Sequence, residues 1–328
     1  MNYGELEVLH HKVLTKTAVD FKFDELQGLK LFPEERIDGI TAKWDILSPS
    51  REKGAFRIPG EPATRVELSK VATRYATCIL MLLEKCLDEA TLAWLRSVGT
   101  DDVTSARARI TQEQAELDRI IQFTKEWAAW QALSGTLTID QDNLKLTVDY
   151  GIASEHKPTA SASWATSTTD IPADLREWKR LVAQDSGLVA GRAFCNESVM
   201  EYLIKNENVS AMLGQGQLRE QVAQFGYIAR FMGLEWGVYD AGYKDGDSFV
   251  PFIPDDKLIL VPAENVFARV QVGTQEIPTG WNETSKVFGK FSYAVVETNP
   301  PGINLFLGEN FLPVVSLPGA IVYADVTP

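Results

Sequence analysis

The sequence is poor in the residues and runs that carry most protein chemistry. Its 328 residues include only three histidines and three cysteines. It contains neither a GxSxG nucleophile elbow nor an HExxH zinc motif. No stretch approaches the ~18 consecutive apolar residues that a membrane-spanning helix needs. The best candidate, CILMLLEKCL, is interrupted by Glu84 and Lys85. These gaps argue against a hydrolase, a metalloenzyme and an integral membrane protein.

The few reactive residues that are present are not spaced for catalysis or metal binding. His10 and His11 are adjacent near one end of the chain, where a solvated tail is the simpler interpretation. Cys78 and Cys86 lack the CxxC spacing of a metal site and fit small buried side chains better. The segment GQGQLREQ lacks the third glycine of a dinucleotide loop, and VFGK lacks the first glycine of a Walker A motif. We therefore predict no metal, no cofactor and no enzymatic activity.

The net charge limits the kinds of partner that the protein can bind. Its net charge is -13, from 32 basic against 45 acidic residues. Such a surface argues against nucleic-acid binding over the bulk of the protein, because a protein neutralises the phosphates with clustered Lys and Arg. It suits solubility, and it suits a surface that lies beside DNA without adhering to it. The first residues show no secretory signal, and the sparse cysteines fit synthesis in a reducing cytoplasm.

One turn-rich segment, residues 44–75, departs from this acidic character. It is rich in Pro and Gly and is locally basic. Its apolar and polar residues alternate as in a strand around residues 55–58 and 64–68. Two interpretations remain open, a solvated hairpin and a projecting loop that lies on a neighbouring acidic subunit. On the second interpretation the residues that contact the adjacent subunit are Arg51, Lys53, Arg57 and Arg65.

The periodicity of apolar residues predicts a mixed α+β fold. The longest pattern is helical over residues 104–134 and ends at Gly135, and a second helix is expected over residues 76–97. TLTIDQDNLKLTVDYG predicts a hairpin, and SEHKPTASASWATSTTD predicts a linker or mobile loop. Helices should then begin after Asp170 and after Asn196, with a third over LREQVAQFGYIARFM. Strands dominate the C-terminal part, so we expect an α+β architecture.

The order of these segments resembles the lambda-type capsid protein E family of tailed-phage major capsid proteins. No single motif is specific, and the resemblance rests on an ordered set that covers nearly the whole chain. The segments that carry it are FPEERIDGITAKWDIL, ITQEQAELDRIIQFTKEWAAWQALSGTLTI, DIPADLREWKRLV, CNESVMEYLIKN, DAGYKDGDSFVPFIPDDKLILVP and NFLPVVSLPGAIVYADV.

The resemblance implies a Hong Kong 97-type fold, in which a long spine helix stiffens a thin plate. It also implies how the chain is divided. The expected parts are an N-terminal arm (1–41), an extended loop (42–74), a peripheral domain (75–165) with its spine helix (104–134), an axial domain (166–285), and C-terminal strands that return to the peripheral domain (286–328).

The resemblance further implies a structural function. Such a protein forms pentamers and hexamers that close into an icosahedral head around double-stranded DNA. Its implied partners are copies of itself, a portal protein, a scaffolding protein and, in some phages, a decoration protein. It would be assembled in the host cytoplasm and end in the virion. Lys53 is a loop lysine, but nothing marks a partner for it, so we predict no crosslink between subunits.

Two other classes of function remain as alternatives. The first is an encapsulin-like compartment shell, which keeps the fold but encloses a cargo enzyme. The second is an ordinary cytoplasmic enzyme with an unrecognised site, which would be a monomer or a small oligomer.

Overall fold

The longest element of the computed structural model is helix α4 (Asp102–Ser134), as the sequence predicts. It ends at Gly135, whose φ of +101° is a conformation that glycine adopts without strain. Ile110, Leu117 and Ile121 form a buried stripe along it. Ile120, which the periodicity also assigns to the apolar set, is 52% exposed.

The structure describes residues 10–21, 25–47, 72–87, 102–141, 144–280, 283–298 and 301–328. The chain divides into two units, each assembled from three separate segments. Unit 1 contains residues 1–42, 75–129 and 269–314, and unit 2 contains residues 43–74, 130–268 and 315–328.

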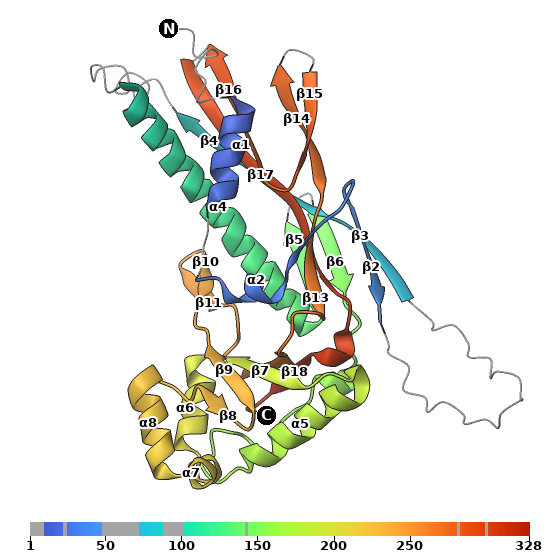
Figure 1. The fold of residues 1–328 in the computed structure, drawn as a ribbon, viewed down its shortest axis with the longest axis vertical. Coiled ribbons are helices and arrows are strands. Elements are labelled where there is room, and N and C mark those ends of the chain that lie inside the picture. Colours follow the sequence, from blue (N-terminus) through green and yellow to red (C-terminus); the bar gives the residue numbers. More distant parts are fainter. Residues whose placement is uncertain are drawn as a thin grey trace, which may run out of the picture. The chain divides into compact units, whose positions relative to one another are not determined.

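Unit 1 is a sheet with helices on one side. Strand β17 (Pro301–Val315) lies at its centre and pairs antiparallel with β16 (Phe291–Thr298) along one edge and with β4 (Ile79–Leu87) along the other. Helix α1 (His11–Asp20) crosses β16 and β17 (Figure 1), and Thr15 exchanges hydrogen bonds with Ser292 of β16. The remaining elements are α2 (Gln27–Leu31), β1 (Glu34–Arg36), β13 (Ala268–Val272), and a hairpin of β14 (Thr274–Gly280) and β15 (Glu283–Phe288).

The prediction of a helix over residues 76–97 is wrong for the part of that segment that the structure describes. The chain there forms the end of β3 (Ala72–Thr77) and then β4. Leu, Met, Glu and Lys favour helices only weakly, and pairing of nine residues of β4 with β17 outweighs that preference. Cys78 is buried as expected, but Cys86 is exposed, so the expectation of a buried side chain is wrong for Cys86.

Unit 2 is built on a mixed sheet in the order β18-β12-β7-β9-β8, with the parallel pair β7–β9 at its centre. Its core contains Trp164, Leu175, Trp178, Leu203 and Leu260. The strands are β5 (Thr136–Gln141), β6 (Leu144–Asp149), β7 (Ala190–Cys195), β8 (Arg230–Phe231), β9 (Leu234–Val238), β10 (Gly242–Asp245), β11 (Ser248–Pro251), β12 (Lys257–Pro262) and β18 (Val322–Asp325). The helices are α5 (Ile171–Ser186), α6 (Glu197–Lys205), α7 (Glu207–Leu213) and α8 (Gln215–Phe225), with short 3-10 turns at Ser154–His156 and Pro318–Ala320.

Local signals in unit 2 predict several elements correctly. Asn196 caps α6 by accepting a hydrogen bond from the backbone of Val199, and Asp170 caps α5. The predicted β5–β6 hairpin forms. Strands β10 and β11 also pair antiparallel. Helix α8 is shorter than predicted and ends at Phe225.

One expectation about a loop is corrected. The segment 154–170, expected as a linker or mobile loop, is a packed part of unit 2. The backbone amides of Ala160 and Trp164 donate to the backbone oxygens of Asp325 and Val326, and Trp164 is only 1% exposed. The N-terminal segment contains the helices α1 and α2 as well as β1.

Candidate functional site

The four residues predicted to contact a neighbouring subunit, Arg51, Lys53, Arg57 and Arg65, lie outside the described residues. What the structure describes is the pair of strands on either side of them. Strand β2 (Thr41–Ile46) pairs with β3, so the chain leaves and returns through adjacent strands.

A set of buried polar contacts joins helix α4 to the rest of unit 1. The ammonium group of Lys125 is buried and lies 2.8 Å from Glu309 Oε1 of β17 and 3.1 Å from Glu34 Oε1 of β1. It also lies 5.8 Å from the centre of the Phe311 ring. Burial alone would lower the pKa of Lys125, but the two carboxylates outweigh it and raise the pKa. The adjacent Glu126 carboxylate accepts hydrogen bonds from two backbone amides of α2.

The same pattern continues towards the start of the helix. Asp118, fully buried, forms an ion pair with Lys290 at 2.9 Å. Glu113 forms ion pairs with Lys85 of β4 and with Arg109. Ion pairs thus join α4 to β1, β4, β17 and Lys290, and such contacts favour one arrangement of these elements because they have few equivalent geometries.

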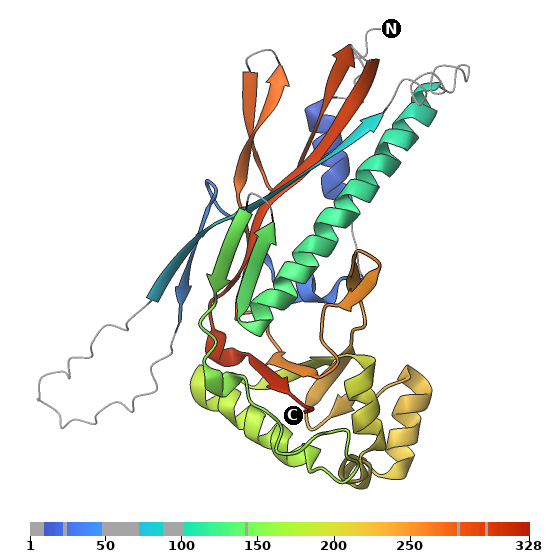
Figure 2. The ribbon, with the colours of Figure 1, turned by 180° about the vertical axis from the view of Figure 1, so that it is seen from behind.

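Apolar side chains are exposed on the face of the sheet opposite α4; Figure 2 shows the backbone of this sheet from behind. Side chains alternate between the two faces of a strand, and on β4 it is Lys85 that reaches helix α4. The even-numbered residues of β4 therefore point away from the helices, as do Tyr293 and Val295 of β16 and Phe306 of β17, by their register. We call this surface the open face; it comprises Leu80, Leu82, Glu84, Cys86, Tyr293, Val295, Glu297, Asn304 and Phe306.

The open face exposes several large apolar side chains. Leu80 is 44%, Leu82 45% and Val295 42% exposed. The rings of Tyr293 and Phe306 stack on it with centroids 4.8 Å apart. Contiguous apolar groups of this kind mark contact surfaces more often than single exposed residues do.

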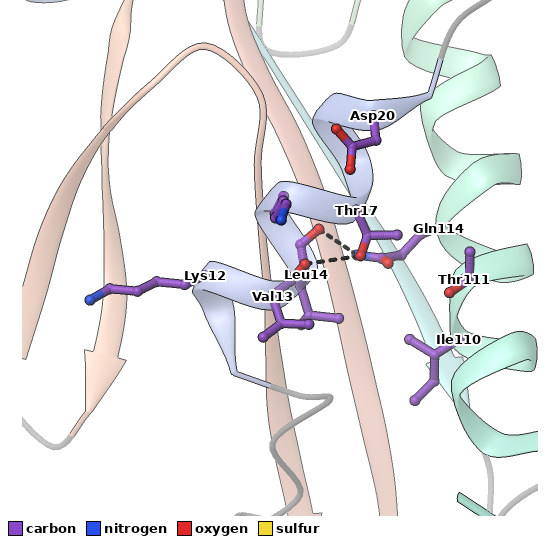
Figure 3. A pocket seen from close by; sticks show the side chains of 9 residues that line it. Lys12, Val13, Leu14, Thr17, Asp20, Ile110, Thr111 and Gln114 are labelled. Atoms are coloured by element: carbon purple, nitrogen blue, oxygen red, sulfur yellow. Dashed lines mark hydrogen bonds between the residues drawn. The ribbon is translucent and has the colours of Figure 1, made fainter. Parts of the chain in front are cut away.

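A groove of about 500 Å³ separates α1 from α4 on the helix side of the sheet (Figure 3). Val13, Leu14 and Ile110 supply its apolar lining. Gln114 closes its floor, since its amide donates to the backbone oxygen of Leu14 and to Ser292 Oγ. Lys12 and Lys16 lie on the α1 side and are exposed.

In unit 2 the buried polar side chain of His156 joins segments that are distant in the sequence. His156, which is 1% exposed, bonds the backbone oxygen of Ile321 at 2.8 Å and Asp185 Oδ2 at 2.7 Å. No local pattern in the sequence predicts this contact, because the two partners lie far from His156 along the chain. In the described ranges no group of three or more His, Cys, Asp and Glu side chains is placed to hold a metal ion. None of the helices described is long and apolar enough to cross a membrane.

Solved structures with similar folds cover nearly all of the chain. The candidate capsid protein of an Escherichia coli CFT073 prophage has a TM-score of 0.66 at 15% identity, with 97% of this chain and 99% of that chain covered. A phage-related protein from Bordetella bronchiseptica RB50 has a TM-score of 0.60 at 15% identity, with 97% of both chains covered. The mature capsid of bacteriophage PhiM1 has a TM-score of 0.52 at 13% identity, with 93% of this chain and 88% of that chain covered. At these identities the likeness concerns the fold, which is the α+β Hong Kong 97-type fold expected from the sequence.

Sequence comparison decides the family. No curated protein has a sequence that matches this chain. The model of the phage major capsid protein E family, however, matches residues 21–326. Its members are structural proteins of the phage shell and not enzymes. A match over nearly the whole length, on a fold of the expected type, shows that this chain belongs to the phage major capsid protein E family and is a component of the virion capsid.

Proposed function

We propose that the chain assembles as pentamers and hexamers that close into an icosahedral head around double-stranded DNA. The observation that carries this proposal is the family match over residues 21–326. Closed symmetry allows one chain to cover a large shell by repeating the same contacts. The net charge of -13 supports a wall that stays close to packaged DNA without binding it in a sequence-specific way.

We further propose that the segments have the functions that the family implies. Residues 1–41 act as the N-terminal arm, 42–74 as the extended loop, 75–165 as the peripheral domain and 166–285 as the axial domain. Residues 286–328 return to the peripheral domain. The paired strands β2 and β3 support the second of these assignments, since they bring both ends of the loop segment to one place.

In this proposal the basic side chains of the loop contact acidic residues of an adjacent subunit. Exposed ion pairs stabilise by only about 0–1 kcal/mol each, so the contact matters through its repetition over the shell. The test replaces Arg57 and Arg65 together by Glu. We expect a folded monomer that assembles poorly, whereas normal shells from the double variant would refute the contact.

The proposed partners are a portal protein, a scaffolding protein and, in some phages, a decoration protein. The alternative, an encapsulin-like compartment, shares the fold and differs in its contents. The family match favours the phage head. A cargo enzyme inside purified particles, in place of DNA, would favour the compartment.

The experiment that tests the assembly is expression of the full chain, followed by negative-stain electron microscopy of the purified material. Closed shells, or rings of five and six subunits, are the expected result. If the chain alone remains small, the neighbouring head genes of the phage are expressed with it. A species that stays small even then would refute the proposed assembly.

A further inference from the structure

The only buried histidine in the described part of the chain lies where three segments of unit 2 meet. His156 closes the first 3-10 turn, and it faces the last turn of α5 and the residue that follows the second 3-10 turn. Its Nδ1 atom lies 2.8 Å from the backbone oxygen of Ile321, and its Nε2 atom lies 2.7 Å from Asp185 Oδ2. We call these three residues the histidine junction.

Both partners of the ring are hydrogen-bond acceptors. A backbone carbonyl oxygen has no proton to donate, and an ionised carboxylate has none either. A neutral imidazole carries a proton on only one of its nitrogens, so the other nitrogen would direct its lone pair at an oxygen. Such a contact is unfavourable where water cannot replace the missing bond, and His156 is 1% exposed. Two donated bonds therefore require a proton on each ring nitrogen, which makes the ring an imidazolium ion.

The end of helix α5 also favours a positive charge on this ring. Asp185 lies in the last turn of this 16-residue helix, and the C-terminal end of a helix dipole is negative. A pocket of about 310 Å³ adjoins the junction and is lined by Gln184, Asp185 and Pro318 among others. The side chain of Asp185 is 51% exposed, so protons from solvent reach the pair although the ring itself is buried.

The other charged groups around the ring do not offset this preference. Glu155 and Lys157 flank His156 in the sequence with opposite charges, and both are exposed. The 3-10 turn Pro318–Ala320 has no titratable side chain. Strand β18 carries Asp325, which forms an ion pair with a lysine of β12, and Tyr323, whose pKa burial raises to about 12. The junction therefore has one carboxylate as the direct partner of one ring.

We propose that the histidine junction is a pH-sensitive contact, in which His156 holds a proton on both ring nitrogens and loses one of its two bonds when a proton leaves. The doubly protonated ring joins the segment 151–160 to α5 and to the C-terminal segment 316–326. The unfolded chain lacks these bonds, so folding takes up a proton wherever the unfolded histidine is neutral. The junction therefore stabilises unit 2 fully in acid, and its contribution is lost as the pH rises. All its members belong to one subunit, so it does not depend on the proposed assembly.

The first test detects the protons on the ring directly. The unassembled chain is labelled with nitrogen-15 histidine, and a long-range proton–nitrogen correlation spectrum is recorded at about pH 7. A ring with both protons gives two nitrogen signals of similar shift, whereas a neutral ring gives two widely separated signals. The signals of His156 are those that a His156→Gln variant lacks. We expect two similar shifts, and two separated shifts would overturn the proposal.

The variant Asp185→Asn tests the reason for the second proton. An asparagine amide donates as well as accepts, so a neutral His156 then makes both bonds, by donating to Ile321 and accepting from the amide. Its ring should give two separated signals at the same pH. Glu155→Gln is the matched control, because it removes an exposed neighbouring carboxylate that bonds Ser154 and not the ring. Similar shifts in Asp185→Asn, or separated shifts in Glu155→Gln, would overturn the proposal.

Urea unfolding followed by tryptophan fluorescence measures the effect of the junction on stability. In the unmodified chain the urea midpoint should fall between about pH 6 and about pH 9, the range through which an ordinary histidine loses its proton. The fall should be smaller in Asp185→Asn, because its junction is satisfied with a neutral ring. The remaining titratable groups are the same in both chains, so the difference between the two falls belongs to the junction. Equal falls in the two chains would overturn the proposed pH sensitivity.

Discussion

Replacing Lys125 by Met should strongly destabilise unit 1, whereas replacing Lys125 and Glu309 together should not. The ammonium and the carboxylate are 1% and 2% exposed and lie 2.8 Å apart. At that distance and an effective dielectric constant of about 20, their attraction is about 6 kcal/mol. Transfer of each ion out of water costs several kcal/mol, so the pair as a whole contributes little net stability.

Lys125→Met removes the attraction between the two ions but leaves the cost of keeping Glu309 out of water. Glu309 would remain buried without its cation, and the expected loss is about 3–5 kcal/mol in the free energy of unfolding. Glu34 does not change this result, because its side chain is 64% exposed and its contact is worth at most about 1 kcal/mol. In Lys125→Met/Glu309→Met both ions are gone, and the expected change is within about 1 kcal/mol of zero or favourable.

The assay is urea unfolding of the unassembled chain, followed by tryptophan fluorescence. An exposed ion pair provides the control: Lys145 and Asp140 lie 3.2 Å apart but are 78% and 66% exposed. Lys145→Met should therefore cost less than about 1 kcal/mol. If the double variant were as unstable as Lys125→Met, the loss would come from packing and the electrostatic reasoning would be refuted.

The pH dependence gives an independent check of the same pair. The carboxylates raise the pKa of Lys125 above its ordinary value of 10.5 despite the burial that opposes them. A raised pKa means that the stability due to the ammonium is fully present below pH 10.5 and is lost as the pH rises through the folded-state value. The double variant should lack this alkaline loss.

Three further predictions concern side-chain contacts within one unit or the other. Asn206→Ala should lower stability by about 1–2 kcal/mol in thermal melting, because its buried side chain caps α7 through the amide of Val209 and donates to the backbone oxygen of Thr169. Trp164→Ala should cost about 3–5 kcal/mol by thermal unfolding, since the ring is 1% exposed; a loss below 1 kcal/mol would mean that segment 154–170 is not part of the core. Gly308→Ala should cost about 1–3 kcal/mol, as an added Cβ would lie 2.6 Å from the Phe291 ring, while Gly216→Ala meets nothing within 4 Å and should be neutral or stabilising in the same denaturation series.

The elements that the sequence predicts correctly are those whose signals are local. Helix α4 has a long apolar period and a glycine at its end, and α6 begins at a capping asparagine. A tight turn flanked by alternating residues is enough to predict the β5–β6 hairpin. Strand β4 shows the opposite case. Its residues favour a helix, and it becomes a strand only by pairing with β17, which lies more than two hundred positions away in the sequence.

The buried polar contacts of α4 could not be predicted for the same reason. On a helical pattern, Asp118 and Lys125 fall among residues that normally face solvent. Both are buried here, where Lys290, just before β16, pairs with Asp118 and Glu309 of β17 pairs with Lys125. Contact surfaces depend still more on tertiary placement. Glu84 and Cys86 acquire a common face only when β4 is a strand. An ordered series of local patterns is therefore enough to reveal the family of a capsid protein. The surfaces that its strands and helices present become visible only when these elements are in place.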